Sequence, residues 1–221
     1  MEPFDPLAVE NVGVTLAIEL IEQPLHSLPP ADRFTGAGVY AIYYTGKHPA
    51  YKRLVGHDKG KGGSKYPVYI GSAVRENAKQ GFNPRPTTKT RLWARLNNHA
   101  ESIRNVVAGG QDPGLKLADF RCRYLVLNDA YITLAESVMI ATFRPAWNGM
   151  GFGSKVVGVE RKSQKPSLWD SLHPGRGGRP AGTAERGRLA RKQIHKSIKR
   201  LSEPAADERT KRMMEKIKMF L

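Results

Sequence analysis

Six polar side chains occur along the first two thirds of the chain, and together they could hydrolyse a phosphodiester bond. They are Tyr40, Tyr69, Arg95, His99, Glu136 and Asn148. A glutamate carboxylate is a hard oxygen ligand that can hold a divalent metal ion against a phosphate oxygen. An arginine fork can hold the pentavalent phosphate, and a histidine or a perturbed tyrosine can take a proton from water. The set therefore contains each type of group that this reaction requires.

Short secondary-structure elements must bring these residues together, and the sequence predicts their order. Apolar periodicity and β-branched or aromatic runs predict strand, basic loop, strand, helix, strand and helix over residues 38–44, 45–66, 67–71, 88–107, 120–127 and 130–143. The two tyrosines fall on the first two strands. Arg95 and His99 are four residues apart, so they share one face of the first helix. Glu136 falls near the start of the second helix, and Asn148 follows the proline that ends it.

The two strand tripeptides carry a resemblance to a known family. Gly-Val-Tyr at 38–40 and Tyr-Ile-Gly at 69–71 resemble the two halves of the GIY-YIG nuclease signature. The resemblance continues through the other four polar positions in the same order and covers residues 34–150. Long insertions after each of the first two strands are similar to those of the restriction-endonuclease branch, in particular the small enzymes that cut CCGCGG. One departure is Ser72, which stands where many repair-type members carry a lysine.

The resemblance implies a role for each residue. Glu136 would hold a single divalent ion, Mg2+, with Mn2+ as a possible substitute, and Arg95 would contact the scissile phosphate. The attacking water would be surrounded by Tyr40, Tyr69 and His99, and Asn148 would position the site. The identity of the base stays open. Free histidine has a pKa of about 6.5 against about 10 for tyrosine, but a phenolate favoured by the metal and the arginine would also serve.

Structural explanations compete with these roles at single positions. Thr133 and Glu136 fit a capping box at a helix start. The tyrosines fit ordinary strand positions, and Arg95 with His99 fits a solvated helix face. Only the joint pattern favours a site. The other histidines show no ligand spacing and are expected in loops or on the surface: His26, His48, His57, His173 and His195.

The chain is strongly basic, with a formal net charge of +16 and a pI near 10.1. Residues 151–221 carry most of this excess and include an expected basic helix at 185–200 and a shorter helix at 204–220. Double-stranded DNA is therefore the expected partner. The candidate contacts are Lys47, Lys52, Arg53, Lys59, Lys61, Lys65, Arg176, Arg179, Arg186, Arg188, Arg191 and Lys192.

The expected fold is α/β, with a small antiparallel sheet of three strands flanked by helices. A single domain over residues 1–221 would comprise a catalytic core at 34–150, a helical extension at 1–33 with its helix at 6–22, and a basic extension at 151–221. The one cysteine, Cys122, excludes an intramolecular disulfide. No apolar run is long enough to span a membrane. Both features favour a cytoplasmic protein with no membrane partner.

Together these features predict a Mg2+-dependent type II restriction endonuclease that cuts both strands of duplex DNA at a short GC-rich palindrome, CCGCGG by resemblance. A palindrome is most simply read by a twofold dimer, so a homodimer is expected. The host would need a matching DNA methyltransferase. Two other classes share part of the pattern: a homing or repair nuclease, and a non-catalytic DNA-binding protein on a decayed nuclease core.

Overall fold

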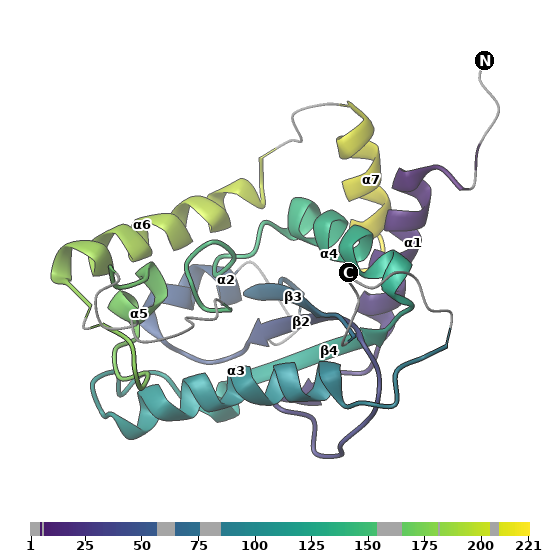
Figure 1. Ribbon diagram of the computed structural model, residues 1–221. Coiled ribbons are helices and arrows are strands. Elements are labelled where there is room, and N and C mark those ends of the chain that lie inside the picture. The colour runs from purple at the N-terminus through teal and green to yellow at the C-terminus, as the bar shows by residue number, and fades with distance from the viewer. Residues whose placement is uncertain are drawn as a thin grey trace.

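One antiparallel sheet of four strands lies at the centre of the computed structural model (Figure 1). Its strands are β1 (His26–Ser27), β2 (Gly38–Tyr44), β3 (Tyr69–Ala73) and β4 (Phe120–Val126). Their order in the sheet is β1-β4-β2-β3, so β3 forms an edge and β2 lies between β3 and β4. The structure describes residues 5, 7–56, 65–75, 85–153, 165–180, 182–203 and 208–221.

Helices cover both faces of this sheet (Figure 1). They are α1 (Val9–Glu22), α2 (Lys52–Gly56), α3 (Arg91–Ala108), α4 (Asp129–Phe143), α5 (Leu168–Leu172), α6 (Ala184–Arg200) and α7 (Glu208–Lys218), with 3-10 turns η1 (Pro49–Tyr51) and η3 (Leu117–Asp119). The pair α1 and α4 packs on one face and α3 on the other, while α7 contacts α1 and α4 from outside. Helix α6 packs on α5 and α2. Among the described helices, none has the length and apolar character needed to cross a membrane.

Strand β2 is buried on both faces, which explains its run of aromatic and branched residues. Its even-numbered side chains, such as Tyr40 and Tyr44, join the core under α3, α5 and α6. Its odd-numbered side chains, such as Val39 and Tyr43, join the core under α1 and α4. Side chains alternate between the faces of a strand, so β2 contributes to both cores at once.

Most elements predicted from the sequence are confirmed with small shifts at their ends. Strand β2 has the predicted bounds, and β4, α4 and α6 differ from theirs by one residue at an end. The strand predicted at 67–71 begins two residues later, at Tyr69, and the helix predicted at 88–107 begins at Arg91. The existence and type of these elements are therefore predicted correctly, and only their ends shift.

Three parts of the fold differ from the expectation. The sheet has a fourth strand, because β1 pairs with β4 through His26 and Cys122 in a segment expected only as an extended connector. The loop expected at 45–66 contains η1 and α2, and α5 is not predicted at all. These pieces are two to five residues long. Segments so short carry no period, and tertiary contacts decide their conformation.

A hydrogen-bonded chain encloses two of the histidines that were expected in loops or on the surface. His173 is fully buried, and its Nδ1 donates to Asp112 Oδ2 at 2.5 Å. His48 Nδ1 accepts from the backbone amide of Ala50 at 3.2 Å, so its Nε2 carries the proton and donates to Asp112 Oδ1 at 3.1 Å. The Tyr51 hydroxyl binds His173 Nε2. Both histidines lie outside helices and strands, as expected, but His173 is buried and His48 is mostly covered, and the cluster ties three distant segments together.

Candidate active site

The candidates on β2 and α3 meet through a buried hydrogen bond. Tyr40 Oη lies 2.6 Å from His99 Nε2. These two residues are 0% and 2% exposed. The ring of Tyr69 on β3 lies 6.2 Å from the Tyr40 ring and 5.2 Å from the His99 ring. Three rings from three elements thus form one cluster beside the edge strand.

Glycine at position 71 makes room for this cluster. Gly71 pairs with Tyr40 across β2 and β3. A Cβ at Gly71 would lie 2.5 Å from Tyr40 Oη and 2.9 Å from Tyr69 Cε1. Both distances are too short for non-bonded atoms. The last glycine of the Tyr-Ile-Gly tripeptide is therefore required by close side-chain approach rather than by a turn.

Burial sets the proton affinities of the three rings. Burial raises the pKa of Tyr40 well above its usual value, the neighbouring Tyr69 raises it further, and Arg95 opposes the shift. Burial also raises the pKa of Tyr69, again against Arg95. The pKa of His99 is lowered well below its usual value by burial and then by Arg95. At neutral pH both phenols keep their protons and the imidazole is neutral, so His99 is the member of the cluster that can accept a proton.

Arg95 lies one turn before His99 on α3 and is half-buried. Its Nη2 donates to the carbonyl oxygen of Gly153 at 2.5 Å. A Cβ on Gly153 would lie 1.9 Å from Tyr69 Oη and 3.4 Å from Arg95 Nη2. The backbone at Gly153 therefore lies directly against the phenol and the guanidinium.

Phe152 and Gly153 are site residues that the sequence reasoning does not identify. The Phe152 ring stacks on the His99 ring at 4.6 Å and 20°, and it meets the Tyr69 ring edge-on at 5.2 Å and 79°. The available signal is an aromatic residue between two glycines, Gly151-Phe152-Gly153. That pattern has no period and is also typical of a turn, so only the tertiary structure identifies it.

Glu136 reaches the site from the other face of β3. Ser72 points to that face because it follows Gly71 by one residue. Its Oγ donates to Glu136 Oε2 at 2.7 Å. The carboxylate also raises the pKa of Tyr40 and Tyr69, which places it within electrostatic reach of both phenols. Glu136 is half-buried, and its oxygens fit Mg2+, which takes few protein carboxylates and fills its other positions with water and phosphate oxygens.

The capping-box explanation for Glu136 is wrong. Helix α4 begins at Asp129, and the side chain of the N-cap Asn128 accepts from the Ala130 amide at 3.1 Å. Thr133 lies in the second turn and is not the N-cap. Glu136 lies almost two turns from the helix start, so it caps nothing there and its carboxylate remains at the sheet edge.

Asn148 binds the open edge of the sheet. Its Oδ1 accepts from the Ile70 amide at 3.0 Å, and its Nδ2 donates to the Ile70 carbonyl at 2.8 Å. The backbone amide of Trp147 donates to the Val68 carbonyl at 2.9 Å. The side-chain amide of Asn148 thus satisfies both backbone groups of Ile70, at an edge where no further strand of the described residues pairs. It holds β3, and with it Tyr69, in place.

The basic residues expected to contact DNA come from distant parts of the sequence. The exposed ones are Lys47, Lys52, Arg53, Arg188, Arg191 and Lys192, and the partly exposed ones are Lys65, Arg179 and Arg186. Lys59, Lys61 and His57 lie outside the described residues. Arg53 of α2 and Arg191 of α6 line one pocket of about 290 Å³. Arg188 and Arg191 also line a groove of about 700 Å³ at the start of α6. Arg53 from the predicted loop and Arg188 and Arg191 from the predicted basic helix therefore lie on adjoining surfaces.

Arg176 differs from the other basic candidates and corrects the expectation. Its side chain is 6% exposed, and its Nε lies 2.7 Å from Asp170 Oδ1, whose side chain is 4% exposed. The guanidinium is enclosed and ion-paired, so it is not an exposed phosphate contact. Arg188 and Arg191, by contrast, keep exposed side chains.

Comparison with known proteins agrees with this geometry. A family model of the Eco29kI GIY-YIG domain matches residues 32–202. The match contains all six candidate residues and the elements from β2 to α6. No curated protein matches the chain. Since the matched region is most of the chain, this protein belongs to the Eco29kI GIY-YIG domain family, a family of restriction endonucleases.

Proposed function

We propose that this protein is a type II restriction endonuclease that hydrolyses both strands of duplex DNA with one Mg2+ ion per active site. The observation that carries the proposal is the enclosed Tyr40–His99 pair beside Arg95, with Glu136 at the same sheet edge. The pair supplies a neutral proton acceptor in a water-poor site. The arginine and the carboxylate supply the charges that a phosphodiester needs.

Arg95 is the residue that binds the scissile phosphate. Its Nη2 now donates to the Gly153 carbonyl. On DNA binding, a non-bridging phosphate oxygen would take the place of that carbonyl, because a charge-assisted hydrogen bond is stronger than a neutral one. The fork shape of the guanidinium then fits the charge that develops on the pentavalent phosphate.

The proton of the attacking water would travel inward through the ring cluster. Tyr69 keeps 9% of its surface exposed and interacts with Tyr40, which binds His99 Nε2. The water gives its proton to Tyr69, Tyr69 passes its own to Tyr40, and Tyr40 passes its own to Nε2. His99 ends as the imidazolium, a form that burial, Arg95 and Arg176 disfavour and that no carboxylate contacts among the described residues. In this proposed relay both residue types take part, since His99 would accept the proton and the phenols would carry it.

Glu136 would hold the metal ion, and the Ser72 hydroxyl orients its carboxylate. Mg2+ bound there would offset the phosphate charge, and Mn2+ would be a possible substitute. Ser72 would then support the metal ligand, in place of the lysine of repair-type members.

Duplex DNA would lie on the basic surface around Arg53, Arg188 and Arg191. The proposed site is the palindrome CCGCGG, read by arginines that pair with guanine in the major groove. A homodimer would cut both strands, with one active site for each. A matching methyltransferase would protect the host DNA.

The test is cleavage of two plasmids that differ only in a CCGCGG site. Each is incubated with Mg2+ or EDTA and with wild type, Glu136→Gln or the control Ser137→Ala, which changes an exposed residue of the same helix. The proposal expects the site-bearing plasmid alone to be linearised, only with Mg2+, and by wild type and the control alone.

Other outcomes separate the alternatives. Cleavage of both plasmids, or of nicked and branched DNA only, supports a repair or homing nuclease. Salt-sensitive binding without cleavage in any metal supports a DNA-binding protein that has lost catalysis.

A further inference from the structure

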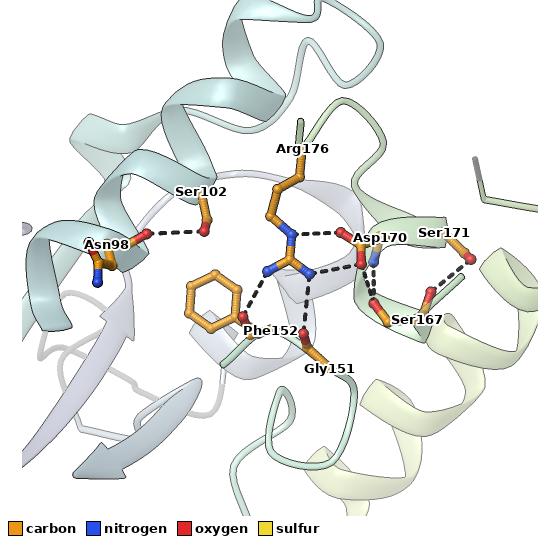
Figure 2. A network of polar contacts seen from close by, with 8 residues as sticks. All are labelled: Asn98, Ser102, Gly151, Phe152, Ser167, Asp170, Ser171 and Arg176. Atoms are coloured by element: carbon orange, nitrogen blue, oxygen red, sulfur yellow. Dashed lines mark hydrogen bonds and ion pairs between the residues drawn. The ribbon is translucent and has the colours of Figure 1, made fainter. Parts of the chain in front are cut away.

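The Arg176 guanidinium donates four hydrogen bonds to three residues, as Figure 2 shows. Nε and Nη2 donate to the two carboxylate oxygens of Asp170 at 2.7 and 2.8 Å. Nη1 donates to the Phe152 carbonyl at 2.8 Å, and Nη2 also donates to the Gly151 carbonyl at 3.2 Å. The group lies 4.9 Å above the Trp169 ring. One side chain therefore fixes two consecutive backbone carbonyls against a carboxylate.

Asp170 is held in place by its own helix, so its carboxylate stays fixed relative to the Gly151 and Phe152 carbonyls. It lies in α5, and the N-cap Ser167 donates from its Oγ to Asp170 Oδ2 at 2.6 Å (Figure 2). The same Oγ accepts from the Asp170 amide at 3.0 Å. Trp169 and Leu172 anchor α5 in the main core. The carboxylate is thus attached to the fold by its own helix.

The fixed segment is the one that touches the catalytic candidates. Phe152 stacks on His99 at 4.6 Å, and the next carbonyl, that of Gly153, accepts from Arg95 at 2.5 Å. Three consecutive residues thus join the Arg176–Asp170 pair to the proposed proton acceptor and to the proposed phosphate ligand. We propose that the Arg176–Asp170 pair is a positioning device that seats Phe152 and Gly153 against His99 and Arg95. This inference rests on the proposed nuclease function.

The chemistry of the pair favours positioning over simple stabilisation. A buried ion pair loses so much hydration that it adds little stability compared with apolar residues of similar size. A planar fork with fixed donor directions gives geometry instead. A lysine keeps the charge but cannot supply four donors in these directions.

The charge of Arg176 has a second effect on His99. The groups that face this imidazole are Tyr40 from β2, Tyr69 from β3, Arg95 from its own helix and Arg176 from the segment after α5. The two arginines favour the neutral imidazole, and both add to burial in lowering the pKa of His99. Loss of the Arg176 charge should therefore raise the pKa of His99, and loss of the fork alone should raise it by a smaller amount, because Phe152 then leaves the ring and burial decreases.

The experiment compares Arg176→Lys and Arg176→Met with Arg212→Met, which removes one exposed charge from α7. Single-turnover cleavage is measured at saturating enzyme across pH, and DNA affinity is measured in EDTA. We expect the saturated rate to fall about 10- to 100-fold in both Arg176 variants, with affinity within about 2-fold of the Arg212→Met control. The acid limb of the rate profile should move to higher pH in Arg176→Met, and by a smaller amount in Arg176→Lys, which keeps the charge but loses the seat of Phe152.

A double variant and histidine NMR cover the cases in which Arg176→Met is unfolded or the wild type does not cleave DNA. If Arg176→Met is unfolded, the double variant Arg176→Met with Asp170→Leu removes both charges, a change that buried pairs often tolerate. It should fold and cleave slowly. Histidine NMR of the free protein follows the His99 ring signals whether or not the wild type cleaves DNA. Arg176→Lys, which keeps the charge, should displace them because Phe152 leaves the ring, and Arg176→Met should displace them further and raise the pKa of His99.

The results that overturn the inference differ from those that overturn the nuclease proposal. A folded Arg176 variant with wild-type saturated rate and weakened affinity makes Arg176 a DNA contact. Unchanged His99 signals remove the positioning role even if no plasmid is cut. A wild type that cleaves nothing in Mg2+ refutes the nuclease proposal. The NMR result still shows whether Arg176 holds Phe152 against His99.

Discussion

Gly153→Ala is the substitution that most directly tests the geometry of the proposed active site. The added Cβ would lie 1.9 Å from Tyr69 Oη, whereas real Cβ contacts below 3.0 Å essentially never occur. The backbone and the phenol must therefore separate by about 1 Å. A misplacement of that size costs about 100-fold in rate, which corresponds to about 2.7 kcal/mol in the barrier. Overpacking also lowers stability by about 1–3 kcal/mol.

The assay separates these two effects. Thermal unfolding reports the stability, and single-turnover cleavage at a temperature where all variants are folded reports the rate. Gly177→Ala is the matched control, since it lies in the same C-terminal segment and its Cβ would meet nothing within 4 Å. A folded Gly153→Ala that cleaves at the wild-type rate would refute the reasoning, because the backbone could not then lie against Tyr69 in the active enzyme.

Three other perturbations test separate parts of the structure. Asn148→Ala leaves both backbone groups of Ile70 without their partner, so we expect a loss of about 2 kcal/mol in the free energy of unfolding and slower cleavage, measured by urea titration and single-turnover kinetics. Burial lowers the pKa of His173 below 6.5, so the unfolded chain binds a proton that the folded state resists. The free energy of unfolding is therefore unaffected by His173 above about pH 6.5. Below that pH it falls with a slope approaching about 1.4 kcal/mol per pH unit. His173→Gln should flatten that slope in urea titrations between about pH 7.5 and 5.5, and an unchanged slope would contradict the assignment. Asn128→Ala should lower the melting temperature through the loss of about 1 kcal/mol of capping energy, whereas Thr133→Ala should be nearly neutral; the reverse order would restore the capping box at residue 133.

Local sequence patterns were sufficient to predict the secondary-structure elements that carry the candidate site. The aromatic run of β2, the periodicity of α3 and the four-residue spacing of Arg95 and His99 depend only on neighbours in the chain. The same is true of the basic excess, since net charge is independent of fold. For this reason the candidate residues could be predicted before any contact was known. The capping box failed because a helix start is decided by competing caps, and Asn128 forms the cap instead.

Contacts between distant segments decided the rest. The sequence shows Arg176 as one basic residue among many, and only packing reveals the carboxylate and the two carbonyls that enclose it. Phe152 has no periodic signal, yet it covers the imidazole of His99. His173 reaches Asp112 across 61 positions of the chain. Residue type and spacing determined which groups were available for chemistry, because these are local properties. Their burial, proton affinity and partners depend on which segments meet, and only the tertiary structure supplies that information.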